Sequence, residues 1–331
     1  MRMPLSDKEL IFGILDKAYD EGINFFDTAD MYGRGFANNP RDPYDGSGKH
    51  TELLGKWLEK SGGRDEIILS TKVRWPLKLA PNNEGLSRNH IIKSLTESLK
   101  SLKTNYIDIL FLHGDANNVN LFDVMKTMDS LQSDFKLNYL GTSNMNAYRI
   151  MEANMISKYN GLIGISALQT KYSLLDREVF EREHQHLAKD LDLAVLAYGI
   201  LSEGFLSGLY QQNHELPNKQ GAEEVFKSNN NPRSWKIIET LNEISQEQGM
   251  SQDQIALAWI NHKHVIDTPL IGVSSIQQLE NSLGALDITL TQDQVNRLDE
   301  VSMQHYPWWS NMDSRNYLNT YEKLIEKYQS N

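Results

Sequence analysis

The chain has 331 residues, with 44 acidic and 33 basic side chains, a formal net charge of −11 and no cysteine. A hydrophobic fraction of 40% and a mean hydropathy of −0.51 indicate a globular chain that can form a large core. Collagen-like, coiled-coil and disordered classes are excluded. Because acidic residues are in excess and no Lys/Arg run is present, nucleic acid is not expected as a partner.

The absence of cysteine excludes disulfides, thiolate nucleophiles, zinc–thiolate sites and iron–sulfur clusters, and we expect no metal site. The first residues lack the apolar stretch of a signal peptide, and no run of about 18 apolar residues follows. The sequence therefore predicts a cytoplasmic protein with no membrane partner.

Short apolar runs alternate with segments of helical periodicity, which is the pattern of βα units around a parallel sheet. Ser/Thr-x-x-Glu/Gln capping boxes predict helix starts at residues 6–9, 251–254 and 291–294. The predicted strands are Ile23–Asp27, Ile67–Lys72, Ile107–Leu112, Tyr139–Ser143, Ile163–Gln169, Leu193–Tyr198 and Val265–Ile271.

These are seven strands, whereas a closed (β/α)8 TIM barrel has eight, and the first predicted helix begins almost at Met1. We therefore predict a TIM barrel that lacks its first strand, seen as seven strands or as an imperfectly closed barrel. Residues 1–331 are expected to form a single domain, with 303–331 as a C-terminal tail. Two loops are predicted to be insertions, at 33–49 and 211–232.

Polar side chains follow three of the predicted strands. Asp27 and Tyr32 follow the first, Lys72 ends the second and His113 follows the third. The carboxyl ends of barrel strands meet at one mouth, so these groups are expected to lie together. An ammonium beside a phenol stabilises the phenolate, and a carboxylate keeps the ammonium charged and in place. Tyr32 is thus predicted to donate a proton to a carbonyl oxygen, and His113 to hydrogen-bond the same oxygen.

Taken singly, a tyrosine after a strand is usually a rim residue, and a lysine at a strand end is usually solvated. The joint occurrence of all four groups favours catalysis. The segment Gly22–Gly33, with the sequence GINFFDTADMYG, closely resembles the signature of the aldo-keto reductase superfamily. The resemblance extends from Leu10 to about Val301 and continues through the sequences STK at 70–72, LFLH at 110–113, GTSN at 141–144 and IGVSS at 271–275.

The resemblance implies a (β/α)8 barrel that uses NAD(P)H without a Rossmann domain, and no Gly-x-Gly-x-x-Gly follows a strand here. The first barrel strand and hairpin of the family are absent from the sequence. Carried over position by position, the catalytic tetrad of the family is Asp27, Tyr32, Lys72 and His113.

The resemblance also implies a set of cofactor contacts. Ser143, Asn144 and Gln169 match positions that hydrogen-bond the nicotinamide carboxamide, and Tyr198 matches the ring that stacks on the nicotinamide. Alone, Ser143 and Asn144 would be interpreted as an ordinary helix cap. The pyrophosphate loop corresponds to Gly199, Leu201 and Gly204, and the adenosine-ribose segment to Gly272, Val273, Ser274 and Gln278.

Three positions depart from the family pattern. Ile200 replaces the usual proline of the loop after Tyr198. Leu209 and Ser274 stand where many relatives place a lysine or arginine for the adenosine 2′-phosphate. NADP(H) is therefore expected on the resemblance, with NAD(H) left open by the weak 2′-phosphate site.

The expected function is NAD(P)H-dependent reduction of an aldehyde or ketone, with a small carbonyl substrate as partner and the oligomeric state left open. Two alternatives remain. One is a cofactor-binding regulatory subunit of the potassium-channel β-subunit type, and the other is a cofactor-free barrel lyase or isomerase. Trp75, Trp308 and Trp309 either line the substrate mouth or cover the barrel. The pairs His184/His186 and His262/His264 are expected to be solvated.

Overall fold

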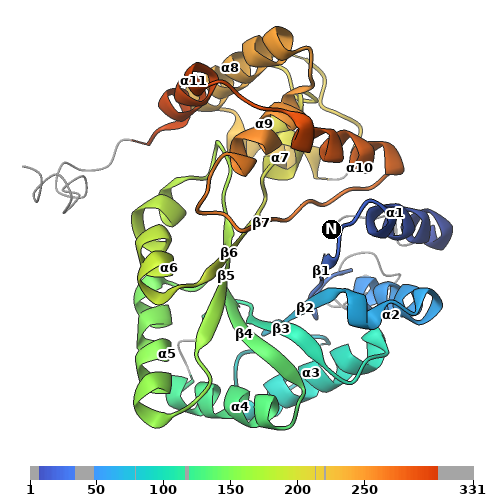
Figure 1. The fold of residues 1–331 in the computed structure, drawn as a ribbon, viewed down its shortest axis with the longest axis vertical. Helices are drawn as coiled ribbons and strands as arrows, with labels where there is room; N and C mark the ends of the chain where they lie inside the picture. Colours follow the sequence, from blue (N-terminus) through green and yellow to red (C-terminus); the bar gives the residue numbers. More distant parts are fainter. Residues whose placement is uncertain are drawn as a thin grey trace, which may run out of the picture.

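A computed structural model describes residues 7–33, 48–78, 80–115, 119–212, 214–219 and 221–304. Its centre is a curled sheet of seven parallel strands that pair in chain order, from β1 to β7 (Figure 1). The strands are β1 (Phe25–Asp27), β2 (Ile68–Val73), β3 (Ile107–Leu112), β4 (Leu137–Ser143), β5 (Ile165–Lys171), β6 (Ala194–Tyr198) and β7 (Thr268–Pro269). The prediction of seven strands is confirmed, with boundaries shifted by a few residues at most.

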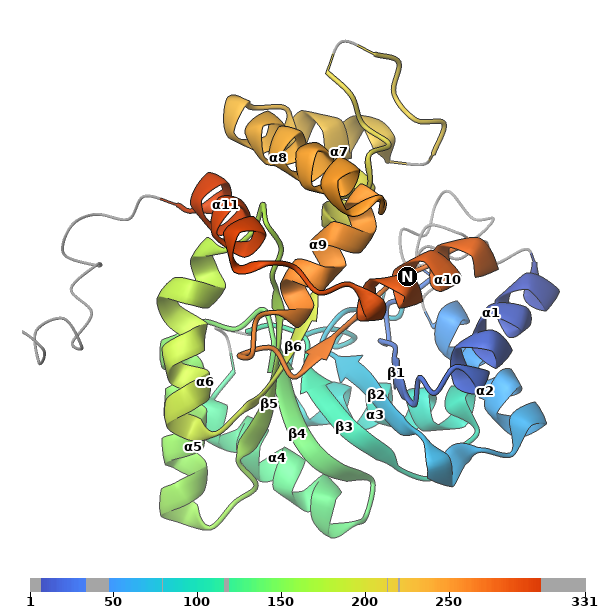
Figure 2. The same ribbon diagram turned by 45° about the horizontal axis from the view of Figure 1, so that its top comes forward.

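Helices alternate with the strands and surround the sheet (Figures 1 and 2). The α-helices are α1 (Lys8–Asp20), α2 (Lys49–Ser61), α3 (Arg88–Leu102), α4 (Leu121–Ser133), α5 (Ala147–Asn160), α6 (Gln185–Leu191), α7 (Ala222–Asn229), α8 (Pro232–Gln248), α9 (Gln252–Asn261), α10 (Ile276–Leu283) and α11 (Gln292–Ser302). Shorter helices are η1 (Arg64–Glu66), the π-helix η2 (Phe180–His184), η3 (Ser202–Ser207) and η4 (Gly284–Asp287).

The predicted capping boxes at Ser251 and Thr291 are confirmed, each with reciprocal bonds to a glutamine three residues on. The predicted box at 6–9 is wrong. Asp7 is the N-cap of α1, and its carboxylate accepts a hydrogen bond of 2.9 Å from the Leu10 amide. An aspartate caps as well as a serine, and its negative charge also suits the positive end of the helix dipole.

Alternate residues of each strand point into the barrel. Leu69 and Val73 of β2 face outward into the large core beneath the helices. Inside the barrel, Phe111, Ala167 and Leu196 form a separate buried cluster. Polar side chains occupy the next inward positions toward the carboxyl ends of the strands. The barrel interior is thus apolar at its base and polar at its mouth.

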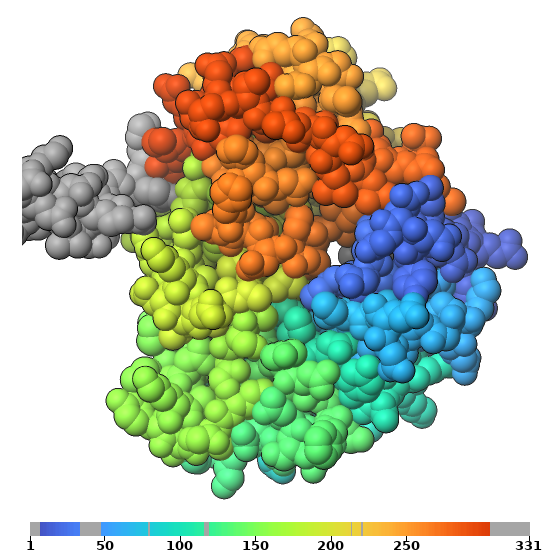
Figure 3. Space-filling view, viewed as in Figure 1, coloured from blue at the N-terminus to red at the C-terminus, as the bar shows by residue number. Residues whose placement is uncertain are grey.

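The sheet does not close on itself among the described residues, since β1 and β7 pair with one neighbour each. The helices meet across this seam, where α1 packs on α10 and Lys17 Nζ lies 3.6 Å from a Glu280 carboxylate oxygen. Figure 3 shows the surface hollowed where the blue N-terminal part meets the orange C-terminal part. The prediction of a (β/α)8 barrel that lacks one strand is confirmed.

The expected loop at 211–232 is partly wrong, because it contains α7. Glu223 and Glu224 lie in the first turn of this helix, where the dipole favours acidic residues, and Ala222 and Val225 are buried. Most of the other expected insertion, at 34–47, lies outside the described residues. So does the tail from residue 305 on, including Trp308 and Trp309. Within the described ranges, no helix is long and apolar enough to cross a membrane.

Candidate active site

Lys72 is the centre of a polar cluster at the mouth of the barrel. It lies on the inner face of β2 and is completely buried. Its ammonium donates to the Asp27 carboxylate, to the Thr28 carbonyl at 3.0 Å and to the Tyr32 hydroxyl at 3.2 Å. An ammonium has three hydrogens, so every donor of Lys72 has an acceptor.

This pairing keeps Lys72 charged. Burial alone lowers the pKa of the Lys72 ammonium, because a low-dielectric interior disfavours charge. The negative charge of Asp27 and the hydrogen bonds to Asp27 and Tyr32 act in the opposite direction, and the net result is a raised pKa. The Tyr32 oxygen therefore faces a permanent positive charge.

The Asp27 carboxylate is itself fixed by two further donors. Its Oδ1 accepts from the Ser70 hydroxyl at 2.6 Å and from the Gln169 amide at 3.1 Å. The sequence analysis missed Ser70 as a member of the cluster. The signal was present, because Ser70 precedes Lys72 by two residues on the same strand and must share its inward face.

His113 lies beside Tyr32, with the two ring centroids 6.2 Å apart. On its other side is Trp75, whose ring centroid is 6.3 Å from that of His113. Burial and the nearby charges of Lys72 and Arg74 lower the pKa of His113 from 6.5 to about 3. The imidazole is therefore neutral at physiological pH, and one ring nitrogen carries a proton that it can donate.

The turn that carries Tyr32 is anchored to two helices. Thr51 of α2 hydrogen-bonds the Thr28 hydroxyl at 2.9 Å and the Ala29 carbonyl at 3.1 Å. The buried Asp30 carboxylate accepts from the Ser94 hydroxyl of α3 at 3.0 Å and from the Arg74 amide at 3.2 Å. These bonds fix the path of the backbone on both sides of Tyr32.

The residues expected to contact the nicotinamide lie at the carboxyl ends of β4, β5 and β6. Tyr198 donates to the Asn144 side-chain carbonyl at 2.7 Å, and Asn144 donates to the Ser143 hydroxyl oxygen at 3.1 Å. In the described part of the chain, the Ser143 hydroxyl hydrogen and the Gln169 side-chain carbonyl are left unused. One donor and one acceptor remain, and a carboxamide needs both. These residues fit a nicotinamide group.

The expected pyrophosphate loop is a tight turn after β6. Gly199 and Gly204 have φ of +70° and +88°, and the Gly204 amide bonds back to the Leu201 carbonyl at 2.8 Å. Lys219, which the sequence analysis missed, donates to the Glu203 carbonyl of this turn at 2.5 Å. Its only sequence signal was that it lies in the polar insertion after the turn. A cation thus accompanies the loop that is expected to hold phosphates.

The expected adenosine segment forms a second turn, between β7 and α10. The Ser274 amide and hydroxyl both donate to the Gln278 side-chain carbonyl, at 2.8 and 2.9 Å. Gly272 faces open space, and Val273 is buried. Neither turn is hydrogen-bonded to the catalytic cluster within the described ranges.

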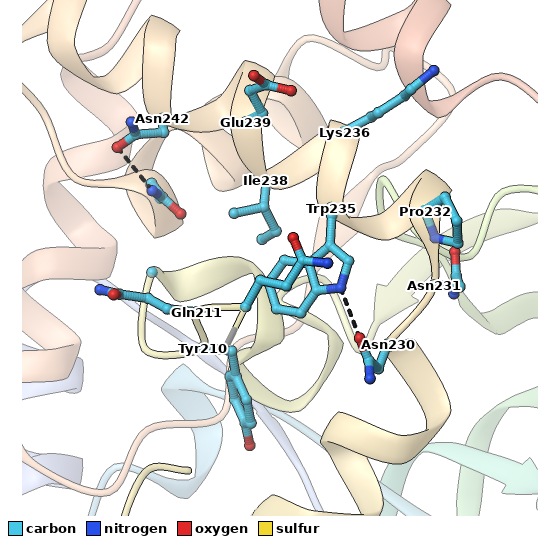
Figure 4. A pocket seen from close by; sticks show the side chains of 13 residues that line it. Tyr210, Gln211, Asn230, Asn231, Pro232, Trp235, Lys236, Ile238, Glu239 and Asn242 are labelled. Atoms are coloured by element: carbon cyan, nitrogen blue, oxygen red, sulfur yellow. Dashed lines mark hydrogen bonds between the residues drawn. The ribbon is translucent and has the colours of Figure 1, made fainter. Parts of the chain in front are cut away.

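A cavity of about 740 Å³ lies apart from this cluster, between the segment after η3 and helix α8 (Figure 4). Trp235 lies in the middle of the view and donates to the Asn230 side chain at 2.8 Å. None of the four expected catalytic residues lines this cavity. Its volume alone does not make it the reaction site.

Burial bears on the expectations for His184 and Trp75. The expectation that His184 is solvated is wrong, since His184 is 4% exposed and its Nε2 lies 3.0 Å from the Met145 carbonyl oxygen. His184 is the last residue of the π-helix η2, and its Nδ1 lies 3.5 Å from the Thr170 hydroxyl, so both ring nitrogens have polar neighbours inside the fold. Trp75 is 36% exposed and lies beside His113, at the mouth.

A parallel barrel sheet with a lysine–carboxylate–phenol cluster at the carboxyl ends of its strands defines a barrel enzyme. The model of the Aldo/keto reductase family matches residues 4–303, and the chain belongs to this family. It is an NAD(P)H-dependent oxidoreductase. A curated relative, the uncharacterized oxidoreductase YrpG of Bacillus subtilis (strain 168), is 29% identical over 301 residues, covering 89% of this chain and 88% of the relative.

Proposed function

We propose that the protein reduces an aldehyde or ketone to an alcohol, with Tyr32 as the general acid. The observation that carries this proposal is the hydrogen bond of 3.2 Å from the buried Lys72 ammonium to the Tyr32 hydroxyl. A positive charge at this distance stabilises the phenolate that remains when Tyr32 has donated its proton. The chemistry that a nicotinamide cofactor would supply, when bound, is the hydride for the carbonyl carbon.

The neighbouring groups either position Lys72 or bind the substrate in this proposal. Asp27 keeps Lys72 charged and in place, and Ser70 and Gln169 hold Asp27. The neutral His113 donates a hydrogen bond to the same carbonyl oxygen, which orients the substrate and stabilises the negative charge that develops there. A small carbonyl compound is thus held between a phenol and an imidazole.

The nicotinamide end of the cofactor would be held by Ser143, Asn144, Gln169 and Tyr198. The turn from Gly199 through Leu201 to Gly204 would hold the pyrophosphate. The adenosine end would lie on Gly272, Val273, Ser274 and Gln278. The family favours NADP(H), but Leu209 and Ser274 offer no cation to a 2′-phosphate, so NAD(H) remains a second candidate.

The variant Tyr32→Phe tests the proposal. Its affinity for NAD(P)H, measured by fluorescence quenching, should be nearly unchanged, because in this proposal the hydroxyl faces the substrate oxygen. Its turnover of a carbonyl substrate should fall by about a hundredfold or more, which is the usual contribution of a general acid. Tyr139→Phe, at a position that is 61% exposed on β4, is the matched control and should keep the parent rate.

The possible outcomes separate the candidate functions. Equal turnover by Tyr32→Phe and the parent would remove Tyr32 as the acid. Cofactor binding by the parent, without turnover of any aldehyde, ketone or quinone in a panel, would favour a regulatory binding subunit. No cofactor binding at all would favour a cofactor-free barrel enzyme.

A further inference from the structure

A cationic side chain that the proposed chemistry does not use lies at the mouth of the barrel. Ser70 and Lys72 share the inward face of β2, and Arg74 follows this strand directly, with its Nε bonded to the Asp115 carbonyl two residues after His113. With a rise of about 3.3 Å per residue, Arg74 starts about 7 Å nearer the opening than Lys72. A substrate with its carbonyl at Tyr32 would extend toward Arg74.

The Arg74 side chain is held beside His113. Its guanidinium carbon lies 4.4 Å from the centroid of the Trp75 ring, and its Nε donates to the Asp115 carbonyl at 2.8 Å. Gly114 has a φ of +117°, and a Cβ there would come within 3.3 Å of Arg74 Cδ and Nε. Because Gly114 has no side chain, the Arg74 side chain can pass close to its backbone, next to the His113 ring.

The terminal nitrogens of Arg74 have no hydrogen-bond acceptor and no carboxylate within salt-bridge distance in the described part of the chain. The neighbouring Asp115 carboxylate binds a different arginine, Arg149, at 3.1 Å. A guanidinium presents planar pairs of N–H donors that match a carboxylate or phosphate. Arg74 thus has a fixed stem and free donors at the place where substrate enters.

We propose that Arg74 binds an anionic group of the substrate, so that the protein acts on carbonyl compounds that carry a carboxylate or phosphate. This inference rests on the proposed function and names its substrate class. Trp75 forms an apolar wall beside the anion, covering the part of the substrate between its charge and its carbonyl. The net charge of −11 repels anions at long range, so selection has to come from this local contact.

Two pairs of aldehydes test the proposal, each matched in ring and reacting group. The first is 4-carboxybenzaldehyde and its methyl ester, and the second is 4-formylphenyl phosphate and 4-methoxybenzaldehyde. In the parent, kcat/KM should favour the charged member of at least one pair by tenfold or more. Arg74→Gln should reduce this ratio by tenfold or more, and Arg74→Lys, which keeps the charge but not the planar fork, should fall between them.

Arg297→Gln is the matched control. Arg297 binds Glu243 and Glu247, neither of which contacts Arg74, so its removal should leave the ratio within about threefold of the parent. Circular dichroism and thermal unfolding would show that each variant is folded. The proposal is overturned if the parent shows no preference in either pair, or if the Arg74 variants keep the parent ratio.

A binding measurement distinguishes this proposal from the proposed function. Calorimetric titration of 4-carboxybenzaldehyde into protein saturated with oxidised cofactor reports binding without turnover. The anion site is supported if Arg74→Gln loses affinity for 4-carboxybenzaldehyde and the parent binds the methyl ester more weakly than the acid. If neither aldehyde is reduced, the proposed function fails, but this result still supports the anion site. The phosphate pair is titrated in the same way, and equal affinity for the charged and the uncharged member of both pairs overturns the anion site, whatever the turnover.

Discussion

Replacing His113 by glutamine should remove a pH-dependent loss of stability. The imidazole is 8% exposed, and burial with the charges of Lys72 and Arg74 lowers its pKa from 6.5 to about 3. The unfolded chain takes up this proton near pH 6.5, whereas the folded chain does not, so the folded state loses stability as the pH falls below 6.5. Between pH 7.5 and 5.0 the loss is about 2 kcal/mol for any folded pKa below about 4.

Urea unfolding of the parent and of His113→Gln at pH 7.5 and 5.0 measures this term. The free energy of unfolding of the parent should fall by about 2 kcal/mol more than that of the variant. His186→Gln, at an exposed position of α6, is the control and should lose as much as the parent. The reasoning is refuted if His113→Gln loses as much stability as the parent, or if the His113 ring is seen by NMR to be protonated at pH 5.

Two further predictions concern helix packing and nucleotide choice. A Cβ at Gly55 of α2 would lie 2.0 Å from the Ser101 carbonyl oxygen, so Gly55→Ala should destabilise by about 2 kcal/mol or more by overpacking. A Cβ at Gly13 of α1 would have its nearest neighbouring atom 3.7 Å away, so Gly13→Ala is the control and should stabilise the protein by up to about 1 kcal/mol. Thermal or urea unfolding measures both changes. A Gly55→Ala variant as stable as the parent would contradict the close approach of α2 and α3. For the nucleotide, dissociation constants of NADPH and NADH should differ by less than about a thousandfold, or roughly 4 kcal/mol, because Leu209 and Ser274 offer no cation. A larger preference for NADPH would show that another basic side chain meets the 2′-phosphate.

Strand ends were the most predictable part of the site. Asp27, Lys72 and His113 could be placed together because parallel strands end at one mouth, and that argument depends only on strand order. The same period of two would have placed Ser70 on the inward face, since it shares a strand face with Lys72. The contacts of the Arg74 side chain were not predictable. They depend on the positions of Gly114 and Trp75 in the folded protein, which sequence spacing does not give.

Other features depend on contacts that the pattern of the sequence does not contain. The buried His184 ring lies beside the Met145 carbonyl and the Thr170 hydroxyl, which are distant in the sequence and which helical periodicity does not predict. Strand β7 is shorter than its apolar run predicts. There the Asp267 side chain accepts from the Val195 amide at 2.7 Å, while the Asp267 amide still donates to the Val195 carbonyl at 2.9 Å, so a side chain takes the place of one backbone acceptor just before the strand. The helix α7 was not predicted, because the polar composition of the segment 211–232 is typical of a loop.

The open seam of the sheet bears on how copies of this protein behave at high concentration. Unpaired strand edges act as templates for a strand from another molecule, which leads to aggregation. Here the edge strands β1 and β7 have only three and two residues, and the helices α1 and α10 lie together outside the seam. So short an edge offers few backbone groups to an incoming chain, and the helices restrict its approach. The shortness of these strands thus opposes self-association through the sheet, although the barrel is not closed by the residues that the structure describes.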